Sequence, residues 1–154
     1  MWGHPKTADR LNLLADRLRS AQAVTPDLIY DLIDGACVRL PALGRAEKAA
    51  RLSRLIDASA WTEVALVLIG LELPQWQVRR LVQDDGEWLC SLSREPNLPM
   101  QFDDTVDVRH EILPLALLGA FLEARQQSAR EVSSSLVPSI RPTTAHVACC
   151  DNFA

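Results

Sequence analysis

The sequence predicts an α+β fold in which about five helices pack around one antiparallel β-hairpin at residues 76–93. Two runs rich in β-forming residues, 76–83 and 87–93, flank an Asp-Asp-Gly turn. The segments on either side of this hairpin instead have apolar residues at helical spacing. Because an isolated hairpin is not stable in water, it must lie on those helices.

Length and composition predict one compact domain, which we place at residues 1–130. The chain has 154 residues, of which 48% are hydrophobic and 23% charged, as is ordinary for a globular protein. A net charge of −4 gives no indication of a nucleic-acid or anionic-membrane partner. Arginine far outnumbers lysine, which is typical of a bacterial protein from a GC-rich genome. The longest apolar run, 64–71, is too short to span a bilayer, and no secretory signal is visible, so we expect a cytoplasmic protein.

Three helices are predicted before residue 59. Thr7 can cap a helix that runs to about Gln22. Thr25, followed by a proline and an aspartate, is a strong start for a helix over 27–40 with one broad apolar face. A proline and a glycine then separate it from a third helix over 45–58.

Two further helices are predicted on either side of the hairpin. Ser59 can cap a helix that ends near Leu73 and is apolar nearly all round, so it belongs in the middle of the core. Residues 94–109 are expected to form a loop with a short strand at 105–108. The last helix runs from about His110 to Ala129, with a proline in its first turn.

Residues 131–154 are rich in serine, proline and threonine and lack periodicity, which predicts a disordered tail. This tail contains Cys149 and Cys150, which together with His146 could donate metal ligands. No fourth ligand follows at a suitable spacing, so no metal site is predicted. All four cysteines, Cys37 and Cys90 included, are expected to be reduced thiols.

Treating 84–86 as a three-residue loop sets the register of the hairpin. Gln83 then opposes Glu87, and the predicted partners of Val82, Arg80 and Val78 are Trp88, Cys90 and Leu92. These pairs share one face with Trp76, and that face should meet the helices. The other face holds Gln77, Arg79, Leu81, Gln83, Leu89 and Ser91.

Arg80 is the exception on this otherwise apolar inner face. A bulge between Arg79 and Arg80 could redirect its side chain. Alternatively, its stem could pack near the sheet edge while its guanidinium reaches water. A third possibility is a buried arginine stacked near Trp88 and paired with Glu63 or Glu72.

The first functional hypothesis is a protein–protein interaction or scaffolding module. Leu81 and Leu89 are expected to oppose each other on the outer face of the hairpin, bordered by Arg79 and Ser91. The neighbouring Arg80 is the fourth candidate interaction residue, with Leu81, Leu89 and Arg79. The hairpin also has an edge with which a partner strand could pair. We therefore expect a protein partner, or a homodimer formed through the hairpin.

A helix–turn–helix DNA-binding regulator is the alternative. Helices 27–40 and 45–58 have suitable lengths. The second carries a basic stripe at a spacing of three residues, made of Arg45, Lys48, Arg51 and Arg54.

Enzymatic function is less well supported. The stretch that contains Asp103, Asp104 and Asp107 resembles the aspartate-rich magnesium motif of isoprenoid synthases. Those enzymes are larger helical bundles with a second acidic motif, which this chain lacks, so we interpret the stretch as a solvated acidic loop with Asp107 near a helix start. No nucleophile elbow, Walker or dinucleotide motif is present, and we infer no catalytic residue, cofactor, metal or small-molecule ligand.

Overall fold

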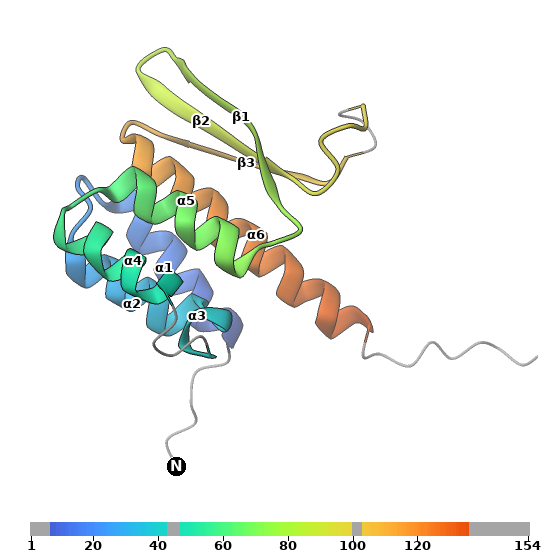
Figure 1. Cartoon of the computed structure of the whole chain (residues 1–154). Helices are drawn as coiled ribbons and strands as arrows, with labels where there is room; N and C mark the ends of the chain where they lie inside the picture. Colours follow the sequence, from blue (N-terminus) through green and yellow to red (C-terminus); the bar gives the residue numbers. More distant parts are fainter. Residues whose placement is uncertain (1–6, 43–46, 100–102, 136–154) are drawn as a thin grey trace, which may run out of the picture.

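In a computed structural model of the chain, a three-stranded antiparallel sheet lies on one side of a layer of helices (Figure 1). The structure describes residues 7–42, 47–99 and 103–135. Six helices and three strands occur in these ranges, so the predicted α+β class is confirmed. They are α1 (Thr7–Ser20), α2 (Pro26–Ala36), α3 (Arg39–Ala42), α4 (Glu47–Asp57), α5 (Trp61–Glu72), β1 (Gln77–Asp84), β2 (Glu87–Ser93), β3 (Thr105–His110) and α6 (Leu113–Ser135).

The helix predicted over 27–40 is broken in two at Cys37, which adopts an extended backbone with φ −95° and ψ 130°. The first piece starts as expected, because the Thr25 side chain accepts a hydrogen bond from the Leu28 N–H. The second piece, α3, begins where the Glu72 carboxylate accepts backbone hydrogen bonds, the shortest being 2.6 Å from the Leu40 N–H. A carboxylate 32 residues away therefore ends one helix and begins another.

The junction between α4 and α5 also differs from the prediction. Ser59 does not cap α5, because the residue before that helix is Ala60. Ser59 instead adopts a left-handed backbone with φ 54°, and its N–H donates to the Ile56 carbonyl. It thus terminates α4 rather than starting α5.

Helices α5 and α6 both contribute fully buried residues to the core. Val64 and Leu68 of α5 are fully buried, as expected for a helix that is apolar nearly all round. Phe121 of α6 is fully buried too, and α6 contacts α1, α5, β2 and β3. Pro114 lies in the first turn of α6, as predicted. The helix continues to Ser135, beyond its expected end at Ala129, while residues 136–154 of the predicted tail lie outside the described ranges.

The hairpin turn has two residues rather than the three expected. Asp85 and Gly86 both have positive φ, 53° and 83°, and Asp84 pairs with Glu87. This is the type I′ arrangement, whose twist matches that of the flanking strands, and aspartate tolerates the left-handed region better than most residues. One residue fewer in the loop shifts the register of the whole upper half of the hairpin.

A β-bulge restores the predicted register at the base of the hairpin. Leu81 pairs with Cys90, where we expected Arg80 to do so, but Val78 pairs with Leu92 as predicted. The extra residue lies between Val78 and Arg80, which confirms the bulge among the three accounts of Arg80. Arg80 is consequently exposed, and the idea that it is buried and paired with an acid is wrong.

A third strand completes the sheet in the order β1-β2-β3. The short strand expected at 105–108 is therefore present and extends to His110, with Val106 opposite Leu92. Both of these side chains are buried against the helices, and Val108 packs on the same core. β2 is thus the central strand, while β1 is left at one edge of the sheet (Figure 1).

Candidate functional site

The outer face of the sheet, turned away from the helices, consists of rows of cross-strand neighbours. One row joins Val82 of β1 to Leu89 of β2 and Arg109 of β3. Val82 is 43% exposed and Leu89 is half-buried, so this row forms a small apolar surface with a guanidinium at one end. The neighbouring row contains Arg80, which opposes Ser91.

The predicted pair of Leu81 and Leu89 does not exist. Leu81 pairs with Cys90 and packs against the core, whereas Leu89 pairs with Val82 on the outer face. The cause is the two-residue turn, because a shift of one residue moves a side chain to the opposite face of the sheet. Among the four residues proposed for interaction, Leu89 and Arg80 lie on the outer face.

Arg79, the bulged residue, attaches the hairpin to the loop before β3. Its guanidinium forms an ion pair with the Asp103 carboxylate and donates a hydrogen bond of 3.0 Å to the Leu98 carbonyl. The Ser93 hydroxyl donates to the same carboxylate at 2.5 Å. Because all these partners belong to the sheet and the loop that joins β2 to β3, Arg79 has a structural role here.

The Asp103 side chain is fully enclosed by its partners, with 0% of its surface exposed. Burial alone would raise the pKa of Asp103, but the hydrogen bonds from Ser93 and Arg79 outweigh it and lower the pKa below its ordinary value.

Asp107 lies in β3 rather than near a helix start, and it accepts a hydrogen bond from the Ser91 hydroxyl. Within the described ranges no three histidine, cysteine or acidic side chains could hold a metal ion together.

Arg94, directly after the last residue of β2, attaches the base of the hairpin to α6. Its guanidinium lies 4.6 Å from the ring centroid of Trp76 and forms an ion pair of 2.7 Å with Glu131. The hydrogen bond and charge of Arg94 lower the pKa of the Glu131 carboxyl. The base of the hairpin is therefore held by arginine contacts on both strands, while its turn extends away from the helices (Figure 1).

The edge of β1 is free along the described part of the chain, since β1 pairs with β2 alone. Asp84 and Glu87 are the first and fourth residues of the β-turn, in which the carbonyl of the first accepts a hydrogen bond from the N–H of the fourth. The backbone N–H and C=O groups of Asp84 therefore point toward β2. Backbone directions alternate along an antiparallel strand, so the N–H and C=O groups of Leu81 and Gln83 point outward. Side chains of both charges, Arg80 and Asp84, are exposed beside them.

The basic stripe predicted on the third helix is only partly within the described ranges. Lys48, Arg51 and Arg54 lie on α4 and are exposed. Arg45 lies outside the described residues. A shallow hollow of about 210 Å³ separates Lys48 and Arg51 from α5.

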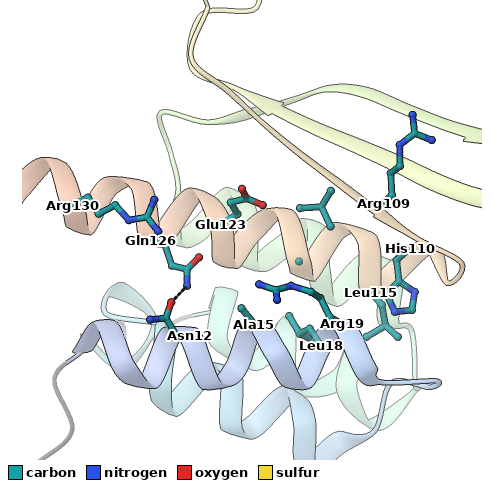
Figure 2. A pocket seen from close by; sticks show the side chains of 12 residues that line it. Asn12, Ala15, Leu18, Arg19, Arg109, His110, Leu115, Glu123, Gln126 and Arg130 are labelled. Atoms are coloured by element: carbon teal, nitrogen blue, oxygen red, sulfur yellow. Dashed lines mark hydrogen bonds between the residues drawn. The ribbon is translucent and has the colours of Figure 1, made fainter.

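A cleft of about 230 Å³ between α1, α6 and β3 was not predicted from the sequence (Figure 2). Asn12 and Gln126 are joined across it by a hydrogen bond of 2.8 Å. Arg19 enters the cleft from α1, whereas Arg109 extends away from it along the sheet (Figure 2). Its polar groups are thus spread out or bonded to each other rather than directed at one point. No sequence pattern indicated this cleft, because the polar residues that line it look like ordinary outward-facing residues of two helices.

Two of the cysteines are buried thiols of low reactivity. Burial and the nearby Glu72 carboxylate raise the pKa of Cys37 to about 12. Burial and the Asp107 carboxylate likewise raise the pKa of Cys90 to about 12. Neither thiol has the lowered pKa that a nucleophilic cysteine needs.

No protein-family model, curated protein or solved structure matches this chain. None of the helices that the structure describes is both long and apolar enough to cross a membrane.

Proposed function

We propose that this protein is a protein–protein interaction or scaffolding module that binds its partner at the free edge of β1. The observation that carries the proposal is the eight-residue strand β1, which within the described residues is paired on one side only and lies on a hairpin that extends away from the helices (Figure 1). An exposed edge of this kind can accept an extended partner strand through main-chain hydrogen bonds.

The surroundings of this edge support binding. Val82 and Leu89 form an apolar surface beside it, which a partner could bury. The bulge, a common device for protecting an edge, lies at the base of the strand, so residues 80–84 stay regular. The arginine contacts at the base hold the hairpin in place, which reduces the ordering needed when a partner binds.

Proline at position 83 tests the proposal. The N–H of Gln83 points outward, so Gln83→Pro removes an edge donor while sparing the β1–β2 hydrogen bonds. Gln83→Ala keeps the N–H and is the matched control. In affinity capture from cells of the source organism, partners should be retained by Gln83→Ala and lost by Gln83→Pro. Partners that Gln83→Pro retains would show that binding occurs elsewhere.

DNA binding through α4 is the second candidate, favoured by the exposure of Lys48, Arg51 and Arg54. Contacts to phosphates would make such binding strongly dependent on salt. Fluorescence anisotropy with duplex DNA between 50 and 200 mM salt, about the range over which phosphate contacts are lost, tests it. Replacing Arg51 and Arg54 by glutamine should abolish binding if the stripe is responsible.

A further inference from the structure

We propose that the partner of β1 is a second copy of this chain, paired antiparallel about a two-fold axis at Val82. The three-stranded sheets of the two copies would then form one continuous sheet. This inference rests on the proposed function, since it uses the same edge, but it adds the identity of the partner and the register.

The backbone permits this register. A two-fold axis at Val82 places Leu81 of one copy opposite Gln83 of the other. Both residues direct their N–H and C=O groups outward, so they form a hydrogen-bonded pair. The two Val82 residues then form the closer, non-hydrogen-bonded pair at the axis, on the outer face of both sheets.

Charge selects this register among those that the backbone allows. With the axis at Val82, Arg80 of each copy lies opposite Asp84 of the other. An axis at Leu81 would instead place Val82 opposite Arg80, and an axis at Gln83 would place Val82 opposite Asp84. Arg80 and Asp84 are both exposed, and neither forms an ion pair within the described part of the chain. Two opposite-charge pairs would therefore flank the central valines.

The apolar surface of the outer face also becomes continuous. Leu89 is the cross-strand neighbour of Val82, so the two copies would bring together two valines and two leucines. The turn end of β1, where the second copy would pair, extends away from the helices that the structure describes (Figure 1). The contact is small, so we expect a weak dimer that forms at micromolar concentrations.

Disulfide trapping tests the register. The non-hydrogen-bonded pair has Cα atoms about 4.5 Å apart, within the range a disulfide spans. In a background carrying Cys149→Ser and Cys150→Ser, Val82→Cys should form a covalent dimer on mild oxidation. Arg80→Cys and Asp84→Cys should each stay monomeric alone but cross-link when mixed. Equal cross-linking of all three variants alone would mean random collision and would overturn the register.

Charge reversal provides a second test without cysteines. Arg80→Asp and Asp84→Arg should each weaken self-association by about tenfold or more, because like charges would then face each other. A mixture of the two variants should associate as a heterodimer, because every pair is again complementary. Sedimentation velocity measures both outcomes, with circular dichroism to confirm folding.

The two proposals fail in different ways. A wild-type dimer that Val82→Cys does not trap would reject this register, and dimerisation that Gln83→Pro leaves intact would reject the edge as well. A wild-type chain that is monomeric at high micromolar concentration would reject self-association. The proposed function would still stand in that case if Gln83→Pro abolished the capture of another protein.

Discussion

Gly119 of α6 lies directly against Val108 of β3: a Cβ atom added to the glycine would be 2.8 Å from the Val108 Cγ1. That distance is shorter than van der Waals contact allows, so the absence of a side chain at Gly119 lets the sheet pack closely on α6. A methyl group added at Gly119 would push β3 away from the core.

Gly119→Ala should therefore destabilise the protein, because the usual cost of overpacking a core, about 1–3 kcal/mol, exceeds the gain of about 0.5–1 kcal/mol in helix propensity. Gly70→Ala is the matched control, because a Cβ there would meet no atom within 4 Å. It should stabilise the protein by about 0.5–1 kcal/mol through helix propensity. Urea denaturation measures both, and a double variant with Val108→Ala should cost less than the sum of the two single changes.

Glu72→Ala should cost about 3 kcal/mol or more, since it leaves the backbone N–H groups of residues 38–40 without their acceptor. Glu72→Gln keeps one acceptor oxygen and should cost less. Glu63 is exposed on the same helix, so Glu63→Ala should change the free energy of unfolding by no more than about 0.5 kcal/mol. Equal losses for Glu72→Ala and Glu63→Ala in urea denaturation would contradict the capping role.

Arg79 and Arg80 are adjacent in β1 but should contribute differently to the free energy of unfolding. Arg80→Ala should cost less than about 1 kcal/mol, because Arg80 is exposed. Arg79→Ala should cost more, since it leaves the enclosed Asp103 carboxylate without its cation. Hydrogen exchange of residues 94–98 should become faster only in Arg79→Ala, because Arg79 also holds the Leu98 carbonyl.

Asp103 should make the folded state sensitive to acid. Its pKa in the folded protein is lowered from an ordinary value of 3.8, so its carboxylate stabilises the fold above that pH. This contribution is lost as the pH falls through the lowered folded pKa. The loss of stability between pH 7 and about pH 3 should therefore be smaller in Asp103→Asn than in the wild type. Urea denaturation at the two pH values measures it, and identical losses would rule out the linkage.

Cys37 and Cys90 should resist alkylation in the folded protein. With pKa values raised to about 12, both thiols carry almost no thiolate at pH 8. Iodoacetamide should modify them at least about a hundredfold more slowly than in urea-unfolded protein. Mass spectrometry of the separate peptides gives the two rates, and rapid native labelling of either would show that its surroundings open readily.

Local patterns by themselves determined the class of the fold and most of its elements. The Thr25 cap, the all-apolar α5 and the first-turn position of Pro114 depend on neighbours within a few residues, so the sequence displays them directly. The hairpin was also predictable, because β-formers and turn residues lie close together in the chain. The arginine on its apolar face indicated the bulge only as one of three explanations.

Tertiary structure decided the features that depend on distant residues or on a single backbone angle. The Glu72 carboxylate breaks the helix predicted over 27–40, and no local pattern there records its presence. The left-handed Asp85 shortens the turn by one residue, which places Leu81 inside and Val82 outside. Which residues of β1 face outward therefore depends on whether Asp85 adopts the left-handed conformation. The energy difference between the two turn conformations is small, so the packing of the sheet decides between them.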